Sequence, residues 1–543
     1  MKIRQYINYT MLLCLLAWST QFMTGCSKSD YMDDFKAENA TGTSSDEPPS
    51  DEVSKALSAV PGISDVSIQY SIADSQKLGY FFFVEQPKDH KNLDKGTFRQ
   101  RCFLSFKDYE SPVVLDTWGY QMPDSVDQME DDQDLVTYLK ANYICVEHRY
   151  FGKSLPEEFE NLDFTYLYTD QAAADLHHVV TLLQKHLFPR ANKWVSTGLS
   201  KGGITTALYA YYSDKNGWDD IDLYVPFCAP FLTGTEENCM DVLFGQYLIN
   251  TCGSGYPEGS SEAIAYQRLR DLPAAITANK PLRDACLKKF HVSDPDVYKE
   301  FLDYYDGKKL EKAATAGVIK AFYVNLVNYF SYIPFSSWAK LVPDPAKAIR
   351  PEADIADFFP VVNFVFMGDK KLNEQVMKDQ QKVTTRSALD DRGILDYRKN
   401  DQDLMVYSLQ AYRELGACSF DYSLVDGTYL TTDFAAEVNY LNCVDNQFSK
   451  RYPRQWDGGQ LMNDVHKWAV TTIAKPIIFV YSRNDPWTGG AIADTANNPS
   501  RKVWKVMNLI GIHSSEFLKN DRCNAEASQT IKSAINSVLN AGK

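Results

Sequence analysis

One serine in the chain has the surroundings of a catalytic nucleophile. Ser200 lies at the centre of Gly198-Leu199-Ser200-Lys201-Gly202, which fits the pattern G-x-S-x-G. Three fixed positions recur by chance in roughly one chain in ten of this length, so the pattern alone is weak. The flanking residues strengthen it, because a strand-like run at 193–197 leads into the serine and a helix-like run at 202–212 follows it. These features predict a nucleophile held on a tight strand-to-helix turn, against the alternative of a plain glycine-rich turn.

A serine on such a turn needs an acidic residue and a histidine later in the chain, in the order Ser, Asp, His. Asp485 follows one apolar strand-like run, and His513 follows the next. The rival base late in the chain is His466, which lies in a helix-like run before Asp485. We therefore predict a Ser200–His513–Asp485 triad. The simpler alternatives are that Asp485 belongs to an Asp-Pro turn and that His513 is a solvent-facing loop residue.

The order of these residues predicts the chemistry of acyl transfer. The histidine would take the serine proton and return it to the leaving group, while the aspartate holds the imidazole tautomer. Backbone N–H groups would bind the oxyanion. We expect one from Lys201 and one from Gly119 or Tyr120, in the loop after the strand-like run at 112–115.

Alternating strand-like and helix-like runs surround these residues. The run pattern from 56 to 230 begins with β-like segments and then alternates strands with helices, which predicts a parallel sheet covered by helices. Residues 231–464 are mostly helical or irregular, and strands resume in 465–543. We therefore expect one α/β domain interrupted by a large helical insertion.

The N-terminus has the layout of an export signal. Lys2 and Arg4 precede the apolar run 10–18, and small residues stand directly before Cys26. This predicts a bacterial lipoprotein signal at 1–26 in which Cys26 receives the lipid, with an ordinary signal peptide and a chance cysteine as the alternative. Residues 27–55 are polar and acidic, and we expect a flexible tether. The expected location is the bacterial cell envelope, in the periplasm or on the outer surface.

Composition excludes several classes of protein. Lys and Arg number 56 and Asp and Glu 71, giving a formal net charge of −15 over 543 residues. An acidic chain without a basic run is a poor ligand for nucleic acid. The single apolar run near membrane length is short and N-terminal, which argues against a polytopic membrane protein.

Cysteine spacing bears on metals and disulfides. There is no zinc-spaced CxxC pair and no HExxH, so we expect no structural or catalytic metal and no cofactor. Beyond Cys14 and Cys26, an odd number of cysteines remains, so at least one should be unpaired. Cys145 and Cys228 lie in apolar runs that favour buried thiols, whereas Cys239 with Cys252, and Cys418 with Cys443, could close disulfides.

Three segments resemble a known family. Residues 147–156 read EHRYFGKSLP, residues 193–203 read KWVSTGLSKGG, and residues 484–487 read NDPW. They resemble the exopeptidase branch of the α/β-hydrolases: the prolyl carboxypeptidase and dipeptidyl peptidase II group, and more closely the secreted tripeptidyl aminopeptidases. The resemblance implies an α/β-hydrolase fold, a helical cap over the site, and release of short peptides, typically tripeptides, from free N-termini. It carries the catalytic roles onto Ser200, Asp485 and His513.

Three further residues are candidates for substrate binding. Glu147 and Arg149 lie in the EHR run, where a buried ion pair that braces the strand end is the favoured alternative. Glu414 lies in a Glu-x-Gly segment that resembles an acidic segment in the cap of related exopeptidases. We expect it to pair with the substrate's α-ammonium, although a solvated helix-end charge explains it equally well.

Other functions remain open at this point. G-x-S-x-G does not reveal the acyl group, so an esterase or lipase fits the same fold. A prolyl-specific exopeptidase of the carboxypeptidase or dipeptidase type is a second alternative. A non-catalytic surface lipoprotein on a hydrolase scaffold is a third, which the intact set of three residues disfavours.

Overall fold

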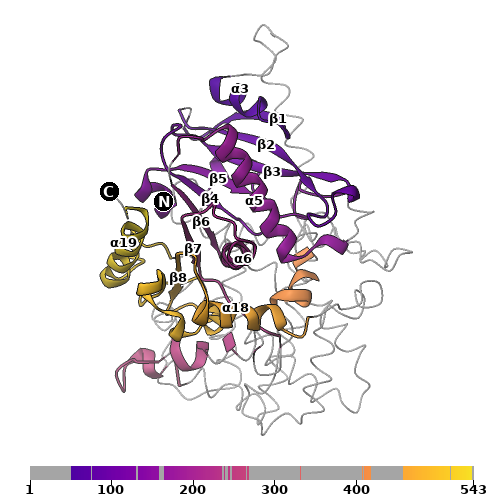
Figure 1. Cartoon of the computed structure of the whole chain (residues 1–543). Coiled ribbons are helices and arrows are strands. Elements are labelled where there is room, and N and C mark those ends of the chain that lie inside the picture. Colours follow the sequence, from indigo (N-terminus) through magenta and orange to yellow (C-terminus); the bar gives the residue numbers. More distant parts are fainter. Residues whose placement is uncertain are drawn as a thin grey trace, which may run out of the picture.

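The computed structural model of this chain describes most of the sheet domain (Figure 1). It covers residues 51–234, 238, 243–267, 331, 406–416, 457–513 and 515–540, apart from residues 75, 130–132, 158–163, 192, 245–246, 253, 265 and 408. The expected signal, Cys26 and most of the expected tether and cap lie outside these residues.

A sheet of nine strands forms the centre of the domain, in the order β1-β2-β3-β5-β4-β6-β7-β8-β9. The first three strands are antiparallel to their neighbours, and the pairs from β5-β4 to β8-β9 are parallel. The strands are β1 (Ile63–Tyr70), β2 (Leu78–Pro87), β3 (Thr97–Ser105), β4 (Val113–Asp116), β5 (Asn142–Val146), β6 (Trp194–Leu199), β7 (Leu223–Phe227), β8 (Ile477–Ser482) and β9 (Val503–Asn508).

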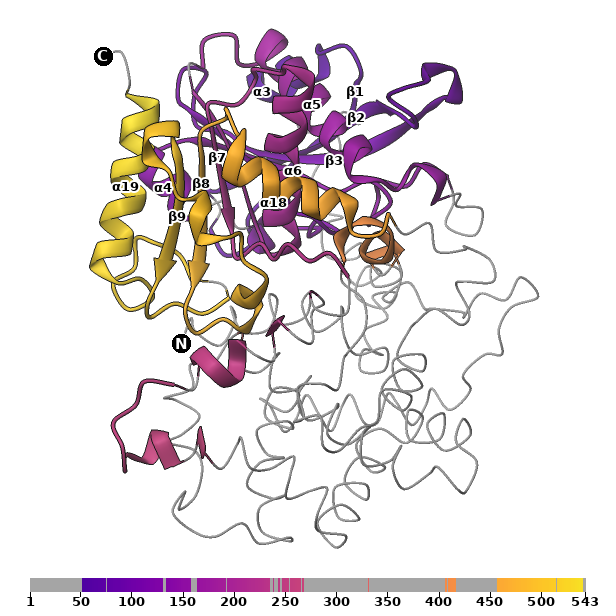
Figure 2. The ribbon, with the colours of Figure 1, turned by 60° about the horizontal axis from the view of Figure 1, so that its bottom comes forward.

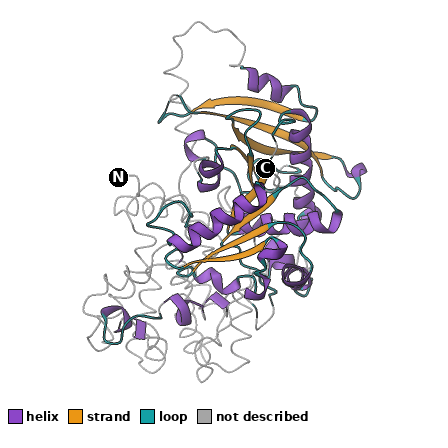
Figure 3. Cartoon of the chain, turned by 60° about the vertical axis from the view of Figure 1, so that its left-hand side comes forward, coloured by secondary structure: helices purple, strands orange, loops and turns teal. Residues whose placement is uncertain are grey.

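Helices flank this sheet (Figures 2 and 3). The α-helices among the described residues are α3 (Glu52–Ser58), α4 (Asp134–Leu139), α5 (Thr169–His186), α6 (Lys201–Asn216), α18 (Gln460–Thr471) and α19 (Ala525–Leu539). Shorter helical turns are η1 (Leu93–Lys95), η2 (Val126–Gln128), η4 (Phe164–Tyr166), η5 (Leu248–Cys252), η7 (Ala411–Leu415), η9 (Pro486–Gly490), η10 (Asp494–Ala496) and η11 (Pro499–Arg501).

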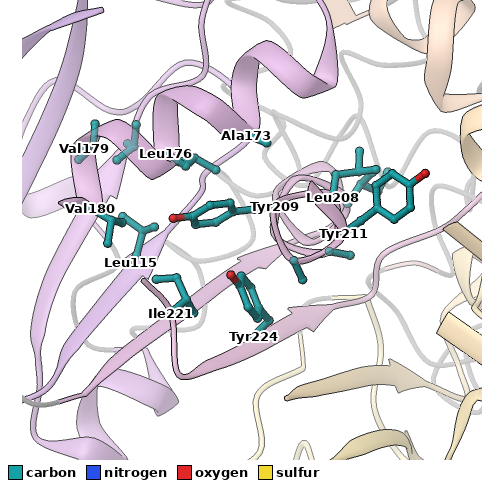
Figure 4. Close-up of a cluster of buried hydrophobic side chains, with 14 of the residues drawn as sticks. Leu115, Ala173, Leu176, Val179, Val180, Leu208, Tyr209, Tyr211, Ile221 and Tyr224 are labelled. Carbon is teal, nitrogen blue, oxygen red and sulfur yellow. The ribbon is translucent and has the colours of Figure 1, made fainter. Parts of the chain in front are cut away.

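Two hydrophobic cores lie on opposite faces of the sheet, because side chains alternate along each strand. Leu115 belongs to the core formed with α3, α5, α6 and α18, whereas its neighbour Val114 belongs to the core formed with α4 and α19. In Figure 4, Leu176 and Val180 of α5 lie near Leu115 and Tyr209. The expected α/β fold with a parallel region covered by helices is confirmed.

Two of the expected domain boundaries, at 55/56 and at 464/465, differ from the structure. Helix α3 begins at Glu52, where Asp51 and Ser54 form a reciprocal N-cap, and Leu57 is buried in the core. The fold therefore begins before residue 56, inside the stretch expected to be a tether. Helix α18 begins at Gln460, before the expected boundary at 465, and Trp468 in it donates a hydrogen bond to Asp214 of α6.

The described cysteines are thiols. Cys102, Cys145, Cys228, Cys252 and Cys523 are buried and lie outside any disulfide. The buried thiols expected at Cys145 and Cys228 are confirmed, and the possible Cys239–Cys252 bridge is wrong because Cys252 is free. Cys239, Cys418 and Cys443 lie outside the described residues. Among the described helices, we find none whose length and hydropathy would let it cross a membrane.

Candidate active site

The carboxyl ends of the parallel strands gather the predicted catalytic residues. Ser200 directly follows β6, Asp485 lies shortly after β8, and His513 lies shortly after β9. The loop holding Gly119 and Tyr120 follows β4. Because these strands are parallel, their carboxyl ends share one edge of the sheet, which is where ligands bind in open α/β sheets.

Ser200 lies on the strained turn that its sequence predicts. Its φ and ψ are 56° and −117°, an unusual conformation for a residue with a side chain. Its N–H donates to the carbonyl of Phe227 at 2.9 Å, and its carbonyl accepts from the N–H of Ile204 at 2.9 Å. The turn is thereby tied to β7 on one side and to the first turn of α6 on the other.

Glycine is required where this turn meets the loop after β4. A Cβ on Gly202 would lie 2.9 Å from the carbonyl oxygen of Trp118, and a Cβ on Gly119 would lie 2.6 Å from the nitrogen of Gly202. Gly119 also has a φ of +89°, which side chains disfavour. The two backbones therefore touch, and the predicted oxyanion residues Gly119, Tyr120 and Lys201 lie in neighbouring segments.

The main-chain groups of the oxyanion candidates Gly119 and Tyr120 have different hydrogen-bond partners. The N–H of Gly119 donates back to the carbonyl of Thr117 within its own turn. The carbonyl of Tyr120 accepts from the N–H of His148 at 3.3 Å. Of the two residues predicted for the second oxyanion donor, Tyr120 is therefore the better candidate, because a donor that bonds within its turn is not aimed at a substrate.

The acid and the base form a buried hydrogen bond. His513 Nδ1 lies 2.7 Å from Asp485 Oδ2, and both side chains are 0% exposed. The other carboxylate oxygen of Asp485 accepts from the N–H of Trp487 at 3.0 Å, which caps η9. The aspartate is thus fixed by the turn that follows β8, and it holds the imidazole in one orientation.

His466 occupies a different environment. It lies in α18, and its Nε2 is 3.1 Å from the carbonyl oxygen of Phe231. Burial lowers the pKa of His466. The structure therefore pairs His513, and not His466, with Asp485.

Two residues near the base were missed from the sequence. The carbonyl of Ser331 accepts from the N–H of His513 at 2.8 Å, and its hydroxyl accepts from Trp487 Nε1 at 2.7 Å. The thiol of Cys228 and side-chain ligand atoms of Asp485 and His513 all lie within 4.8 Å of one another. Ser331 is far away in the chain and carries no motif. Cys228 could have been found from its place directly after β7, between the nucleophile strand and the acid strand.

Glu147 and Arg149, which the sequence suggested as substrate-binding residues, are not placed where they could contact a substrate. Both are fully buried. The carboxylate of Glu147 accepts from the N–H groups of Met122 and Lys153 and from Ser154 Oγ, at 2.7–3.0 Å. Burial raises the pKa of Glu147 to about 7, against the opposing charge of Arg101. Glu147 therefore braces the loop after β5 and offers no group to a ligand. The alternative, a buried ion pair that braces the strand end, holds only in part: both residues are buried, but Glu147 bonds to the loop after β5 and Arg149 pairs with Asp175.

Glu414 belongs to η7, and its side chain lies at the N-terminus of α5. Its carboxylate accepts from the N–H of Thr169 at 2.7 Å and from Thr169 Oγ1 at 3.2 Å. Burial raises the pKa of Glu414 to about 8. Each carboxylate oxygen has more than one acceptor site, so these bonds do not exhaust its capacity. Glu414 is therefore no solvated helix-end charge, as the alternative proposed, but a partly buried carboxyl group.

The segment 406–416, which carries Glu414, also contacts the loop after β4 that holds Gly119 and Tyr120. The ring of Tyr407 lies 5.8 Å from that of Tyr120, and Gln410 Nε2 lies 3.5 Å from His148 Nε2. This part of the insertion therefore packs against the residues beside the nucleophile.

A mixed sheet in this strand order, with a serine on a tight turn after β6, an acid after β8 and a histidine after β9, defines an α/β-hydrolase. Residues 46–274 match the family described as PS-10 peptidase S37. The chain is 22% identical over 447 residues to a prolyl tri/tetrapeptidyl aminopeptidase of Streptomyces mobaraensis, covering 81% of this chain and 76% of that protein. It is 24% identical over 301 residues to the serine protease vicPa of Bipolaris victoriae, covering 47% of this chain and 56% of that protein.

These findings indicate a serine peptidase similar to the tripeptidyl aminopeptidases, the group that its motifs resemble. Solved structures that it resembles include a proline iminopeptidase of Mycobacterium smegmatis, at 10% identity and a TM-score of 0.35 over 85% of this chain and 100% of that one. The esterase LipA of Xanthomonas oryzae matches at 11% identity and a TM-score of 0.33 over 90% and 95% of the two chains. At these scores neither structure bears on the reaction, and the fold is assigned from the sheet order.

Proposed function

We propose that the protein is an exported, lipid-anchored exopeptidase that releases short peptides, mainly tripeptides, from free N-termini. The buried hydrogen bond between His513 and Asp485, at the same sheet edge as Ser200, carries the catalytic part of this proposal. The name of the Streptomyces relative supports the substrate class, because that protein is a tri/tetrapeptidyl aminopeptidase.

The reaction proceeds through an acyl-enzyme. Ser200 Oγ attacks the scissile carbonyl while His513 accepts its proton, and the N–H groups of Lys201 and Tyr120 hold the oxyanion. His513 then protonates the leaving amine, which departs as the shortened peptide. A water molecule, deprotonated by the same imidazole, releases the N-terminal fragment and restores Ser200. Asp485 stabilises the imidazolium at both stages.

Glu414 recognises the free N-terminus in this proposal. A buried α-ammonium needs an anionic partner, and Glu414 is a partly buried carboxyl group on the segment that packs against Tyr120. Wild-type protein is expected to cleave a free peptide and to reject its N-acetyl form, whereas Glu414→Gln should lose mainly the advantage of the free amine. Equal cleavage of both substrates by wild type would contradict the aminopeptidase function.

Residue preference and fragment length decide between related functions. A peptide library digested by the protein and read by mass spectrometry gives both in one experiment. A strict requirement for proline at the cut would favour the prolyl-specific alternative, which the name of the Streptomyces relative also favours. Faster turnover of simple esters than of any free peptide would favour an esterase, and absence of labelling by a fluorophosphonate probe would favour a non-catalytic protein.

The envelope location is tested separately. Wild-type protein made in bacteria should incorporate labelled palmitate, and Cys26→Ser should not. Protein that starts at Ser27 should be soluble and active, because the catalytic residues all lie beyond the tether. Insoluble or inactive protein would show that the N-terminal segment contributes to the fold.

A further inference from the structure

The side chain of Lys201 is buried directly beside the nucleophile. The residue is 2% exposed and begins α6. Its ammonium donates to the carbonyl of Gly119 and lies 4.6 Å from the ring centroid of Phe151 and 5.2 Å from that of Tyr120. A carbonyl and two aromatic faces therefore hold this cation in one place.

Helix formation does not explain a lysine at this position. The N-terminus of a helix carries partial positive charge, so a cation in the first turn of α6 is unfavourable. Burial of an ammonium adds a desolvation cost, which the carbonyl and the rings offset. Burial and the nearby charge of Lys201 also lower the pKa of His148 well below its usual value, so the imidazole there stays neutral. At 2% exposure, Lys201 itself has no surface with which to contact a peptide chain.

The carbonyl that Lys201 holds belongs to the same peptide unit as the N–H of Tyr120. A trans peptide unit is planar, and its C=O and N–H point in opposite directions. No cis peptide bond occurs among the described residues. A hydrogen bond that fixes the Gly119 carbonyl therefore also fixes the direction of the Tyr120 N–H. On the other side, the N–H of His148 fixes the carbonyl of Tyr120.

We propose that Lys201 is a positioning residue for the oxyanion hole, acting through the peptide unit that joins Gly119 to Tyr120. Its ammonium orients the Tyr120 N–H toward the oxyanion, and by polarising the shared amide it makes that N–H a stronger donor. This inference rests on the proposed function. It gives the lysine of the Ser-Lys-Gly-Gly sequence a role that needs its charge and its length.

Lys201→Met tests the role, because methionine keeps the apolar stem and loses the charge and the donor. We expect kcat to fall about 10- to 100-fold, less than the loss of a whole oxyanion donor, with KM changed by less than about threefold. Affinity for a peptide boronic acid that mimics the tetrahedral intermediate should fall by the same factor as kcat/KM. Inhibition by the same tripeptide with a C-terminal amide, whose carbonyl oxygen is neutral, should change little.

Lys215→Met is the matched control. Lys215 lies at the other end of α6 and also rests on an aromatic ring, with its ammonium 4.3 Å from the centroid of Tyr211. Unchanged kcat and boronate affinity in folded Lys201→Met would overturn the inference. So would an equal loss of tripeptide-amide and boronate binding, which indicates general damage to the site. If Lys201→Met does not fold, Lys201→Arg keeps a cation with displaced donors and should show a smaller loss confined to kcat.

Fluorophosphonate labelling separates failure of this inference from failure of the proposed function. If wild type does not label at Ser200, the proposed function fails. If wild type labels and Lys201→Met labels at the same rate, the function stands and the role of Lys201 is refuted.

A second inference concerns Cys228, Asp485 and His513, which come from loops after three different strands. Their ligand atoms lie within 4.8 Å of one another, whereas ligand atoms around tetrahedral zinc are about 3.3–3.8 Å apart. A shift of roughly 1–1.5 Å would close that difference. Thiolate, imidazole and carboxylate are the ligands that zinc prefers. Catalysis uses two of these groups and not the thiol.

We infer that Zn²⁺ binds these three groups and inhibits the enzyme, because the bound ion and the His513–Asp485 hydrogen bond compete for the same atoms. Zn²⁺ should inhibit wild type reversibly and slow its labelling by a fluorophosphonate, and Mg²⁺ should do neither. Relative to its own metal-free rate, Cys228→Ala should need at least about tenfold more Zn²⁺ for the same inhibition, whereas the control Cys252→Ala should match wild type. Equal sensitivity of Cys228→Ala and wild type, or no inhibition of wild type, would refute the site.

Discussion

Arg149 and Asp175 form a two-point ion pair with both side chains 0% exposed. Arg149 Nε and Nη2 each lie 2.7 Å from a different oxygen of Asp175. The remaining N–H groups of the guanidinium donate to the main-chain carbonyls of Pro87, Lys88 and Tyr166. The arginine of the EHR run therefore ties α5 to the end of β2 and to the turn at η4.

Loss of one partner of this pair should destabilise the fold strongly. Arg149→Met leaves a buried carboxylate without its cation and leaves three carbonyl oxygens without their hydrogen-bond donor. We therefore expect a loss of about 3–5 kcal/mol in the free energy of unfolding. Asp175→Leu combined with Arg149→Met should lose less than the sum of the single changes, because neither charge is then left alone. Urea denaturation of the four proteins measures both effects. Additive losses would mean that the two groups do not depend on each other.

Ser200→Ala should abolish turnover without unfolding the protein. Removal of the nucleophile leaves only binding and the oxyanion hole, so kcat should fall by on the order of 10⁴ or more. Peptide hydrolysis measures the rate, and circular dichroism with thermal unfolding checks the fold. Near-normal turnover in the folded variant would refute the nucleophile assignment.

His513→Ala should be comparably damaging, whereas His466→Ala should be mild. His513 bonds to Asp485, while His466 bonds to the carbonyl of Phe231 in another part of the domain. His466→Ala serves as the matched control, because it also removes an imidazole, here a partly buried one, from the C-terminal part of the chain. A larger loss of kcat in His466→Ala would require another base.

The sequence predicted those features that depend on chain order and local pattern. The turn at Ser200 followed from glycine spacing between a strand and a helix, and Asp485 and His513 followed from their places after strands. These signals are local, because each residue type is required by the backbone or the chemistry at that position. The same reasoning could not say which N–H of the Gly119–Tyr120 pair bonds within its own turn.

Contacts between segments that are distant in the chain could not be predicted from the sequence. The partner of Arg149 proved to be Asp175, and the carbonyl that holds the backbone of His513 comes from Ser331. Both depend on how separate elements dock, and no spacing rule relates them. The start of α3 was missed for another reason: the acidic composition before it indicated disorder, whereas Asp51 and Ser54 form a capping pair that starts a helix.

The pH dependence of peptide cleavage should reveal Glu414. Its pKa is raised from 4.5 to about 8 by burial, so the free enzyme at pH 7 holds it mostly neutral. The carboxylate that pairs with an ammonium forms as pH rises through about 8, while a peptide's α-amino group, with a pKa of about 7.7–8.0, loses its proton over the same range. For free-amine peptides, kcat/KM should therefore peak narrowly near pH 8 in wild type. Glu414→Gln should show a lower maximum and an acidic limb at lower pH.

The same shift predicts a change in stability with pH. A carboxyl group whose pKa is raised in the folded state stabilises fully below its unfolded pKa, and that contribution is lost as pH rises through the folded pKa. Glu414→Gln, which keeps an acceptor for the N–H of Thr169, should therefore gain stability relative to wild type between pH 6 and pH 9. Asp170→Asn removes a neighbouring carboxylate at the start of α5 whose charge also raises the pKa of Glu414. It should therefore lower that pKa and move the acidic limb toward lower pH, while the carboxylate of Glu414 stays in place. If Glu414→Gln and wild type share one pH profile of kcat/KM on free-amine peptides, Glu414 does not bind the substrate's N-terminus. If the two proteins also differ equally in stability at pH 6 and pH 9, Glu414 does not titrate in this range.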